Sequence, residues 1–456
     1  MTTVDEILAS LPDAPAAAPE DGEERSGHLS AEFYAARPVF QHIQQAAHSQ
    51  GRPADVLFYS TLARLSGMIS PHLKAVTGIS GRASLNVFAA AVGPSGSGKS
   101  TGQSGARELI LPEDPEFRDG LPVGTGEGIA EMFMGTVDEP TGEIHLRGPL
   151  KGDPVTRKVR KQVRHNGYIY IDEGQTMATL AMRQGSTLAE TLRRAAVGEA
   201  LGQTNASEER TRYVAPGSYS LGLFVGFQPS TAVPLLNDAS TGTPQRFFWC
   251  WSLDPSIPNV PPLWPGPIKD HPGQIQAADT IDVMFPERIR RMLWEERTAR
   301  NRGDLEVAEL DGHAGLMKVK AAALFALMDG GRYEVTEEDW GLAETVWAAS
   351  CAVRDALVAR ARREAEAERK AAEDAKVNAE VRVHIARNEV DRRMERLVRL
   401  VVRHCSKPGG ISFGYMRRAL RTEDRPYLSE AVDLAEEREL VIVEGDHISP
   451  NTTART

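Results

Sequence analysis

The amino-acid sequence predicts an α/β fold in which helices flank a parallel sheet. Short apolar runs alternate with helical patterns between residues 85 and 251. Continuous apolar runs of this kind are typical of strands buried on both faces of a parallel sheet. A glycine-rich segment follows the first run directly and precedes a helical pattern. The expected strands are LNVFAAAV at 85–92, GYIYID at 167–172, SLGLFVGF at 220–227 and FFWCW at 247–251.

Composition limits the class of protein. The chain has 456 residues, is 41% apolar and carries a formal net charge of −10, so it can form two or three domains with a substantial core. The negative net charge of the chain argues against a protein that coats nucleic acid nonspecifically. Three distant cysteines predict neither a disulfide framework nor a zinc ribbon and favour a reducing compartment. No apolar run approaches the ~18 residues of a membrane-spanning helix, so we expect a cytoplasmic protein without membrane contact.

Changes in composition divide the chain into six segments. Helical periodicity precedes the strands, prolines crowd 254–272 after them, and residues 355–396 are polar on all sides, which is typical of a solvated helix that acts as a spacer. Helical patterns followed by LVIVEGDHIS near the end have the order of a winged helix. The predicted segments are a disordered arm at 1–30, an N-terminal helical segment at 31–80, a sheet core at 81–260, a helical lid at 261–354, a long charged linker helix at 355–392 and a winged-helix-like domain at 393–456.

The segment GPSGSGKST fits the pattern GxxxxGK[ST] and predicts a P-loop. Its glycines let the backbone turn tightly and present N–H groups to phosphate oxygens, while Lys99 reaches the β and γ phosphates. The Ser100 hydroxyl is expected to bind Mg²⁺. The cofactors predicted are therefore ATP and Mg²⁺. The expected nucleotide-binding residues are Gly93, Pro94, Ser95, Gly96, Ser97, Gly98, Lys99, Ser100 and Thr101.

The strand motif YIYIDE carries two acids to the carboxyl edge of the sheet. Asp172 is expected to hold the Mg²⁺ shell, and Glu173 is expected to orient and deprotonate the attacking water. A glutamate in this position favours hydrolysis over transfer of the phosphoryl group to a small molecule. The sequence therefore predicts a P-loop ATPase.

Two further residues are candidates for catalysis. Gln228 follows the strand at 220–227 and would help to place the water near the γ phosphate, or would only cap the strand end. Arg246 precedes FFWCW and would act across a subunit boundary on transition-state charge, or would form a structural salt bridge.

Two segments have a local excess of positive charge. Residues 146–165 hold seven Lys or Arg and one Asp. If this segment is helical, its cations form one stripe that would contact DNA phosphates, or a solvated or subunit-contacting face. In the terminal domain, basic residues gather on the second helix, whereas the third helix is acidic and would repel phosphates. The predicted nucleic-acid contacts are Arg157, Arg160, Lys161, Arg164, Arg417, Arg418 and Arg421.

These motifs together resemble a family of P-loop ATPases from phages, plasmids and integrative elements that is similar to AAA-type primase-helicase ATPases. The resemblance covers roughly residues 35–345 and rests on SLNVFAAAVGPSGSGKST, YIYIDEGQ, TLAETLRRAAVGEAL, LFVGFQPS and QRFFW. It implies an AAA-like P-loop fold with a helical lid, a homo-oligomer such as a hexamer, and an arginine-finger role for Arg246. The lid helix of such proteins usually supplies a second sensor arginine; here it offers Lys320, and the assignment stays open.

Three functions are consistent with this sequence. The leading hypothesis is an ATP-driven DNA helicase or translocase that acts on single-stranded DNA in the replication of a mobile genetic element. The first alternative is a replication initiator or helicase loader that uses ATP as a switch. The second is the ATPase subunit of a phage-defence or packaging complex with a protein partner.

Overall fold

The computed structural model describes residues 26–452, apart from 80, 148, 184, 204–211, 238–240, 276 and 278. The chain forms two compact units, residues 1–365 and 366–456, and the boundary lies within helix α12 (Glu337–Cys405). The arm predicted at 1–30 lies outside the described residues as far as residue 25. Its end packs on the core, since Leu29 is buried and the carbonyl of Ser26 accepts from the Trp251 indole at 2.8 Å. Among the residues described, no helix is both long and apolar enough to span a membrane.

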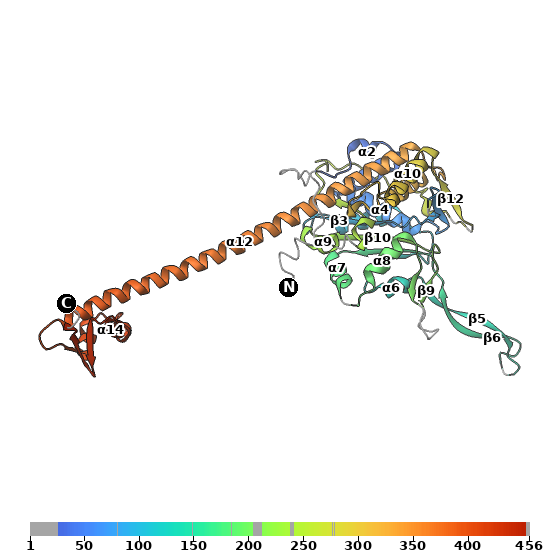
Figure 1. The fold of residues 1–456 in the computed structure, drawn as a ribbon. Coiled ribbons are helices and arrows are strands. Elements are labelled where there is room, and N and C mark those ends of the chain that lie inside the picture. Colours follow the sequence, from blue (N-terminus) through green and yellow to red (C-terminus); the bar gives the residue numbers. More distant parts are fainter. Residues whose placement is uncertain are drawn as a thin grey trace. The chain divides into compact units, whose positions relative to one another are not determined.

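A five-stranded parallel sheet forms the centre of the first unit, with strand order β11-β3-β10-β7-β4 (Figure 1). The α/β class and the parallel sheet are thus confirmed. Strands β10 and β11 begin and end at the residues that the sequence predicts, and β3 and β7 fall within or beside their predicted runs. The strands are β3 (Phe88–Val92), β4 (Arg118–Leu121), β7 (Asn166–Ile171), β10 (Ser220–Phe227) and β11 (Phe247–Trp251).

Helices cover both faces of this sheet because its side chains are apolar on both sides. One face packs against the N-terminal helices, of which α4 is buried along its whole length. Gly222 of β10 permits this approach, since a Cβ there would lie 1.8 Å from the carbonyl oxygen of Ala63 in α4. The opposite face packs against α6, α8, α9 and residues 353–358 of α12. The helices before α10 are α2 (Ala31–Ala35), α3 (Pro38–Ser49), α4 (Ala54–Met68), α5 (Lys99–Leu109), α6 (Gly126–Glu131), α7 (Gly174–Met182), α8 (Leu188–Val197) and α9 (Pro229–Leu236).

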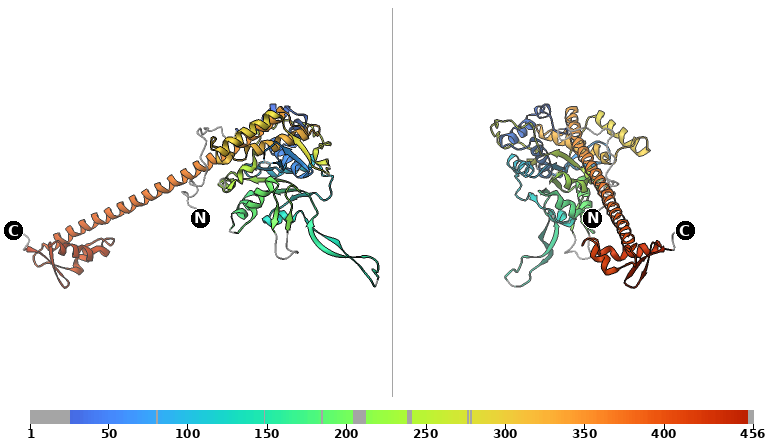
Figure 2. Two further views of the ribbon diagram at one scale, coloured as in Figure 1. Left: turned by 45° about the vertical axis from the view of Figure 1, so that its right-hand side comes forward. Right: turned by 90° about the vertical axis from the view of Figure 1, so that its left-hand side faces the viewer.

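Three smaller sheets and the helices α10 and α11 also belong to the first unit. The N-terminal segment predicted to be helical ends in strand β1, which pairs with β12 and β2. A long hairpin, β5–β6, extends beyond the central sheet in Figure 1 and in both views of Figure 2. The elements are β1 (Leu73–Val76), β2 (Arg82–Ala83), β5 (Met134–Ile144), β6 (Pro154–Gln162), β8 (Leu201–Gln203), β9 (Arg212–Val214), β12 (Ile281–Met284), α10 (Glu287–Arg302) and α11 (Ala314–Met328).

The second unit consists of the end of α12, two shorter helices and a three-stranded antiparallel sheet. The end of α12 supplies its first helix, and α12 runs without interruption across the predicted lid and linker boundary at residue 354. Leu397, Val401 and Cys405 of α12 are buried with apolar residues of the following helices and strands. The remaining elements are β13 (Ile411–Ser412), α13 (Phe413–Ala419), α14 (Leu428–Glu437), β14 (Val441–Glu444) and β15 (His447–Pro450), with sheet order β13-β15-β14.

Candidate functional site

The glycine-rich segment forms a tight loop between β3 and α5, as the sequence predicts. Gly98 is the N-cap of α5 and has a φ of 89°, a left-handed conformation that favours glycine. The Lys99 ammonium turns back into the loop and donates to the carbonyl oxygens of Gly93 at 2.9 Å and Pro94 at 2.6 Å. Burial lowers the pKa of Lys99, and nearby Asp172 opposes this shift. The loop therefore holds one partly desolvated cation at the start of a helix, where backbone N–H groups favour an anion.

Strand register brings the acid pair to the same edge of the sheet as this loop. Val92 of β3 is aligned with Phe227 of β10, and Val225 is aligned with Ile171 of β7. The residues that follow these strands therefore lie together. Asp172 accepts a hydrogen bond of 2.6 Å from the hydroxyl of Tyr170.

The turn after the acid pair depends on a close contact with β10. Glu173 is the N-cap of α7, and Gly174 follows it against the ring of Phe227. A Cβ at Gly174 would lie 2.2 Å from this ring, so only glycine lets the chain turn here without displacing β10. This contact fixes where the carboxylate of Glu173 emerges.

These side chains line one cavity of about 230 Å³ at the carboxyl edge of the sheet. Gln228 also lines it, at the start of α9, where its backbone N–H donates to the Thr231 hydroxyl at 3.0 Å. The carboxyl edge of a parallel sheet is where α/β proteins bind their ligands. The lining residues are Ser95, Gly96, Ser97, Gly98, Lys99, Ser100, Asp172, Glu173, Gly174, Gln175, Gly226, Gln228 and Thr231, and none of them belongs to the predicted lid.

The donor set of this cavity fits phosphate groups together with Mg²⁺. One lysine and the N-terminus of α5 supply positive charge for phosphates. The Ser100 hydroxyl and the Asp172 carboxylate are oxygen ligands of the kind that Mg²⁺ takes. Residues 26–452 with the gaps given above contain no cluster of three or more His, Cys, Asp or Glu suited to a metal ion. Mg²⁺ does not require one, because it is usually held by one or two carboxylates together with substrate phosphates.

The fourth predicted catalytic residue, Arg246, does not line this cavity. It precedes β11, and Phe247 is aligned with Phe88 at the amino ends of β11 and β3, whereas the loop follows the carboxyl end of β3. Its guanidinium donates to the carbonyl of Gly242 and lines a separate cavity of about 520 Å³, which Arg297 and His313 also line. Burial, followed by the charge of Arg193, lowers the pKa of Arg246. Within one chain, Arg246 is therefore remote from the glycine-rich loop.

Lys320, the cation that the resemblance offered as a second sensor, is also remote from the glycine-rich loop. Its side chain is 1% exposed and donates to the carbonyl oxygens of Asn86 at 2.8 Å and of Ala196. Asn86 precedes β3, so Lys320 lies toward the amino ends of the strands. It joins α11 to the segment before β3 and to α8, and it is not among the residues that line the cavity of about 230 Å³ at the carboxyl edge of the sheet.

The helix that would align Arg157, Arg160, Lys161 and Arg164 in one stripe does not form, because the first three of these residues lie in strand β6 of a hairpin and Arg164 follows that strand. In a strand, alternate side chains share a face, so Arg157 and Lys161 lie on one face and Arg160 on the other. Three of the four predicted contacts have acidic partners. Arg160 pairs with Glu131, Lys161 with Glu139 at 2.8 Å, and Arg164 with Glu116 at 3.0 Å.

The terminal arginines lie on and after α13, in the second unit. Arg417 and Arg418 are exposed on α13, and Arg421 follows it and lies 3.9 Å from Glu423. The acidic side chains of α14 are exposed as well, so this helix does present negative charge to solvent.

Sequence reasoning missed two features. The Tyr170 hydroxyl on Asp172 was not expected, although a tyrosine two residues before the acid shares its face of the strand. A row of arginines near the end of α12 was not singled out as a site, because the predicted boundary between the linker helix and the terminal domain at 392/393 divides it, although the i, i+4, i+7 spacing of these arginines is visible in the sequence. No protein-family model matches the chain, and no curated protein matches it at a significant level.

Proposed function

We propose that this chain is a Mg²⁺-dependent, ATP-hydrolysing DNA helicase or translocase of a mobile genetic element, with an AAA-like P-loop core that works as a homo-oligomer. One observation carries the proposal. The phosphate loop, the two acids after β7 and the glutamine after β10 line a single cavity at the carboxyl edge of the sheet. A phosphate-binding loop alone is consistent with many reactions, whereas the two carboxylates beside it favour hydrolysis.

Each side chain has a role in this proposal. Lys99 would bind the β and γ phosphates, and the N–H groups of the loop would replace part of the hydration shell of the phosphates. Bound Mg²⁺ supplies Lewis-acid stabilisation of phosphate charge, and Ser100 and Asp172 are the residues that would hold it. Glu173 would accept a proton from the attacking water, and Gln228 would orient that water.

Action on DNA is supported by charge outside this cavity. The β5–β6 hairpin and the terminal unit both carry exposed arginines in a chain whose net charge is negative. Arg246 is remote from the loop of its own chain, which fits a role against a neighbouring subunit. A ring of copies would then place ATP between subunits and basic elements along a strand of DNA.

The first test is ATP hydrolysis by the full chain with Mg²⁺. Lys99→Ala should abolish nucleotide binding or turnover, because no other cation lines the cavity among the residues that the structure describes. Lys318→Ala, which removes a lysine of α11 outside the cavity, is the matched control. Full turnover by Lys99→Ala would contradict the proposal.

A strand-displacement assay on forked DNA then separates a helicase from an initiator or loader. A helicase should displace the labelled strand in an ATP-dependent reaction that Lys99→Ala cannot perform. DNA-stimulated hydrolysis with no displacement would instead assign the chain to the ATP-switched class.

A further inference from the structure

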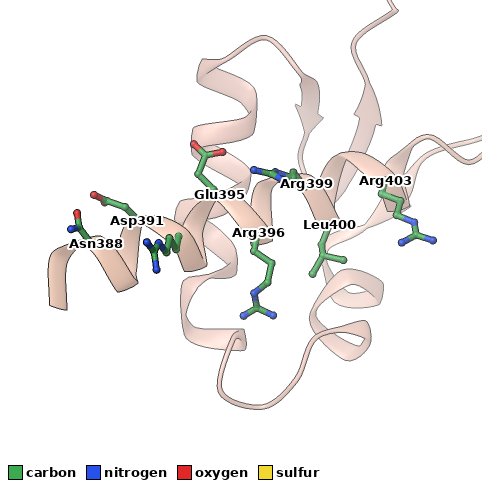
Figure 3. Close-up of a pocket in the computed structure, with 8 residues that line it drawn as sticks. Asn388, Asp391, Glu395, Arg396, Arg399, Leu400 and Arg403 are labelled. Atoms are coloured by element: carbon green, nitrogen blue, oxygen red, sulfur yellow. The ribbon is translucent and has the colours of Figure 1, made fainter. Parts of the chain in front are cut away.

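One face of α12 in the second unit carries a row of four arginines, which we call the arginine row. At 100° per residue, the spacing i, i+4, i+7, i+11 places all four within a sector of about 60°, along about 16 Å of helix axis. They line a shallow groove of about 690 Å³ (Figure 3). The arginine row is Arg392, Arg396, Arg399 and Arg403; the groove also includes Asn388, Asp391, Glu395 and Leu400.

The arginine row faces away from the core of its unit. Leu397, Val401 and Cys405 are fully or almost fully buried on the opposite side of the same helix. Figure 3 shows Arg396 and Arg403 on one side of the helix and Glu395 on the other, with the side chain of Arg399 extending toward Glu395. The guanidinium groups of Arg392, Arg399 and Arg403 are therefore available to a partner that approaches α12 from outside.

Most of this charge is not neutralised within the chain. Arg392, Arg399 and Arg403 form no ion pair among the residues that the structure describes, whereas Arg396 pairs with buried Asp424 at 2.7 Å. Farther along α12 toward its start, arginines do pair at i,i+4, as Arg360 does with Glu364.

Two acids line the same groove, but they only partly offset the arginines. Glu395 pairs with Arg438 of another element at 2.7 Å, which leaves Asp391 as the one carboxylate in this groove without an ion pair among the described residues. Three unpaired guanidinium groups against one carboxylate leave the groove positive.

We propose that the arginine row binds the phosphodiester backbone of nucleic acid without reading the bases. This inference rests on the proposed function for its choice of DNA as partner. Guanidinium groups bind phosphate oxygens in a bidentate manner, and successive phosphates of one strand advance about 3.4 Å along a duplex. Arginines spaced about 4.5 to 6 Å along the axis therefore contact separate phosphates. The row thus adds a second candidate DNA-binding face to this unit besides the arginines on and after α13, whereas the exposed carboxylates of α14 repel DNA.

The test measures binding of the full-length protein to labelled DNA, without ATP, over a series of salt concentrations. The double variant Arg399→Ala/Arg403→Ala should lower the slope of log affinity against log salt by about 1.8 on duplex or about 1.4 on single strands. The loss should be equal on two unrelated sequences, because backbone contacts carry no sequence information. Arg399→Lys/Arg403→Lys should keep most of the slope, since charge is retained.

The matched control is Arg382→Ala/Arg387→Ala, which removes two exposed arginines of α12 outside the row. An unchanged slope in the Arg399/Arg403 variant, or an equal loss in the control, would overturn the inference. Binding to phosphatidylserine vesicles that depends on the row, with no binding to DNA, would overturn it too. If the salt slopes change as expected but the protein hydrolyses no ATP, this inference is supported and the proposed function is refuted. If the protein hydrolyses ATP but the slopes of the variant are unchanged, the proposed function is supported and this inference is refuted.

Discussion

Glu173 is the residue on which the distinction between binding and hydrolysis depends. It lines the cavity as the N-cap of α7, held there by the contact of Gly174 with Phe227. Glu173→Gln keeps the shape of the side chain and removes the base, so ATP binding should persist while turnover falls about 10²- to 10⁴-fold. Nucleotide binding and single-turnover hydrolysis measure the two effects separately. Glu306→Gln, at an exposed glutamate outside the cavity, is the control, and normal turnover by Glu173→Gln would remove this residue from the role of base.

Lys320 makes the stability of the first unit depend on pH. Burial, followed by the charge of Arg246, lowers the pKa of Lys320 to about 7, whereas an unfolded lysine has a pKa of about 10.4. Between these values the unfolded chain binds more protons, so the free energy of unfolding contributed by this group increases as the pH rises from about 7 toward about 10.

In Lys320→Met this pH-dependent contribution is absent. The gain in stability between about pH 7 and pH 9 should therefore be smaller in Lys320→Met than in the wild type. Urea denaturation followed by tryptophan fluorescence measures it, since all six tryptophans lie in the first unit. Lys318→Met, on the same helix, is the control; equal pH slopes in wild type and Lys320→Met would contradict the argument.

At the scale of elements, one carboxylate contributes to the attachment of the β5–β6 hairpin to the core, together with the hydrogen bonds between Gln162 of β6 and Ser218 at 3.0 and 2.7 Å. Glu131 of α6 accepts from Arg160 of β6 and, at 2.8 Å, from Arg212 of β9. Arg160→Ala removes the attachment on the hairpin side, at a cost of about 1 kcal/mol for a partly exposed pair. Amide hydrogen exchange in β5 and β6 should then be about fivefold faster.

Arg157→Ala is the comparison variant, because Arg157 forms no ion pair within the part of the chain that the structure describes. It should leave exchange unchanged and weaken DNA binding if the hairpin contacts phosphates. Weaker DNA binding by Arg160→Ala with unchanged exchange would instead show that Arg160 contacts DNA directly.

The sequence predicted buried strands well and the exposed hairpin poorly, for one physical reason. Strands β10 and β11 are buried on both faces, so their continuous apolar runs have no helical alternative of that length. The hairpin is mostly exposed to solvent and buries no apolar face. Its sequence therefore shows neither the apolar period of a helix nor that of a strand clearly. Val155, Val159 and Val163 are spaced by four, which matches one face of a helix and also one face of a strand.

The candidate site could be predicted because its residues belong to contiguous motifs at strand ends. Parallel pairing then brings those ends together whatever lies between them. The roles of Arg246 and of the arginine row depend instead on which edge of the sheet and which face of α12 are exposed in the folded chain. The spacing of residues within a motif does not show which face is exposed.

At the scale of the whole molecule, the position of Arg246 separates a self-contained enzyme from one that needs a second copy. Arg246 lies toward the amino end of β11, whereas ATP would lie at the carboxyl edge of the sheet. If a neighbour's Arg246 completes the site, then Arg246→Ala and Lys99→Ala subunits, each inactive alone, should regain activity when they are mixed.

When the two variants are mixed in equal amounts in a ring with heterologous contacts, about one quarter of the interfaces carry both intact residues, so turnover should approach a quarter of wild type. Mixing Arg246→Ala with the double variant Lys99→Ala/Arg246→Ala is the control that cannot complement. If the activity of the mixture does not exceed that of this control, Arg246 has a structural role within its own subunit. In that case an intact Arg246 in a neighbouring subunit cannot restore the activity of an Arg246→Ala subunit.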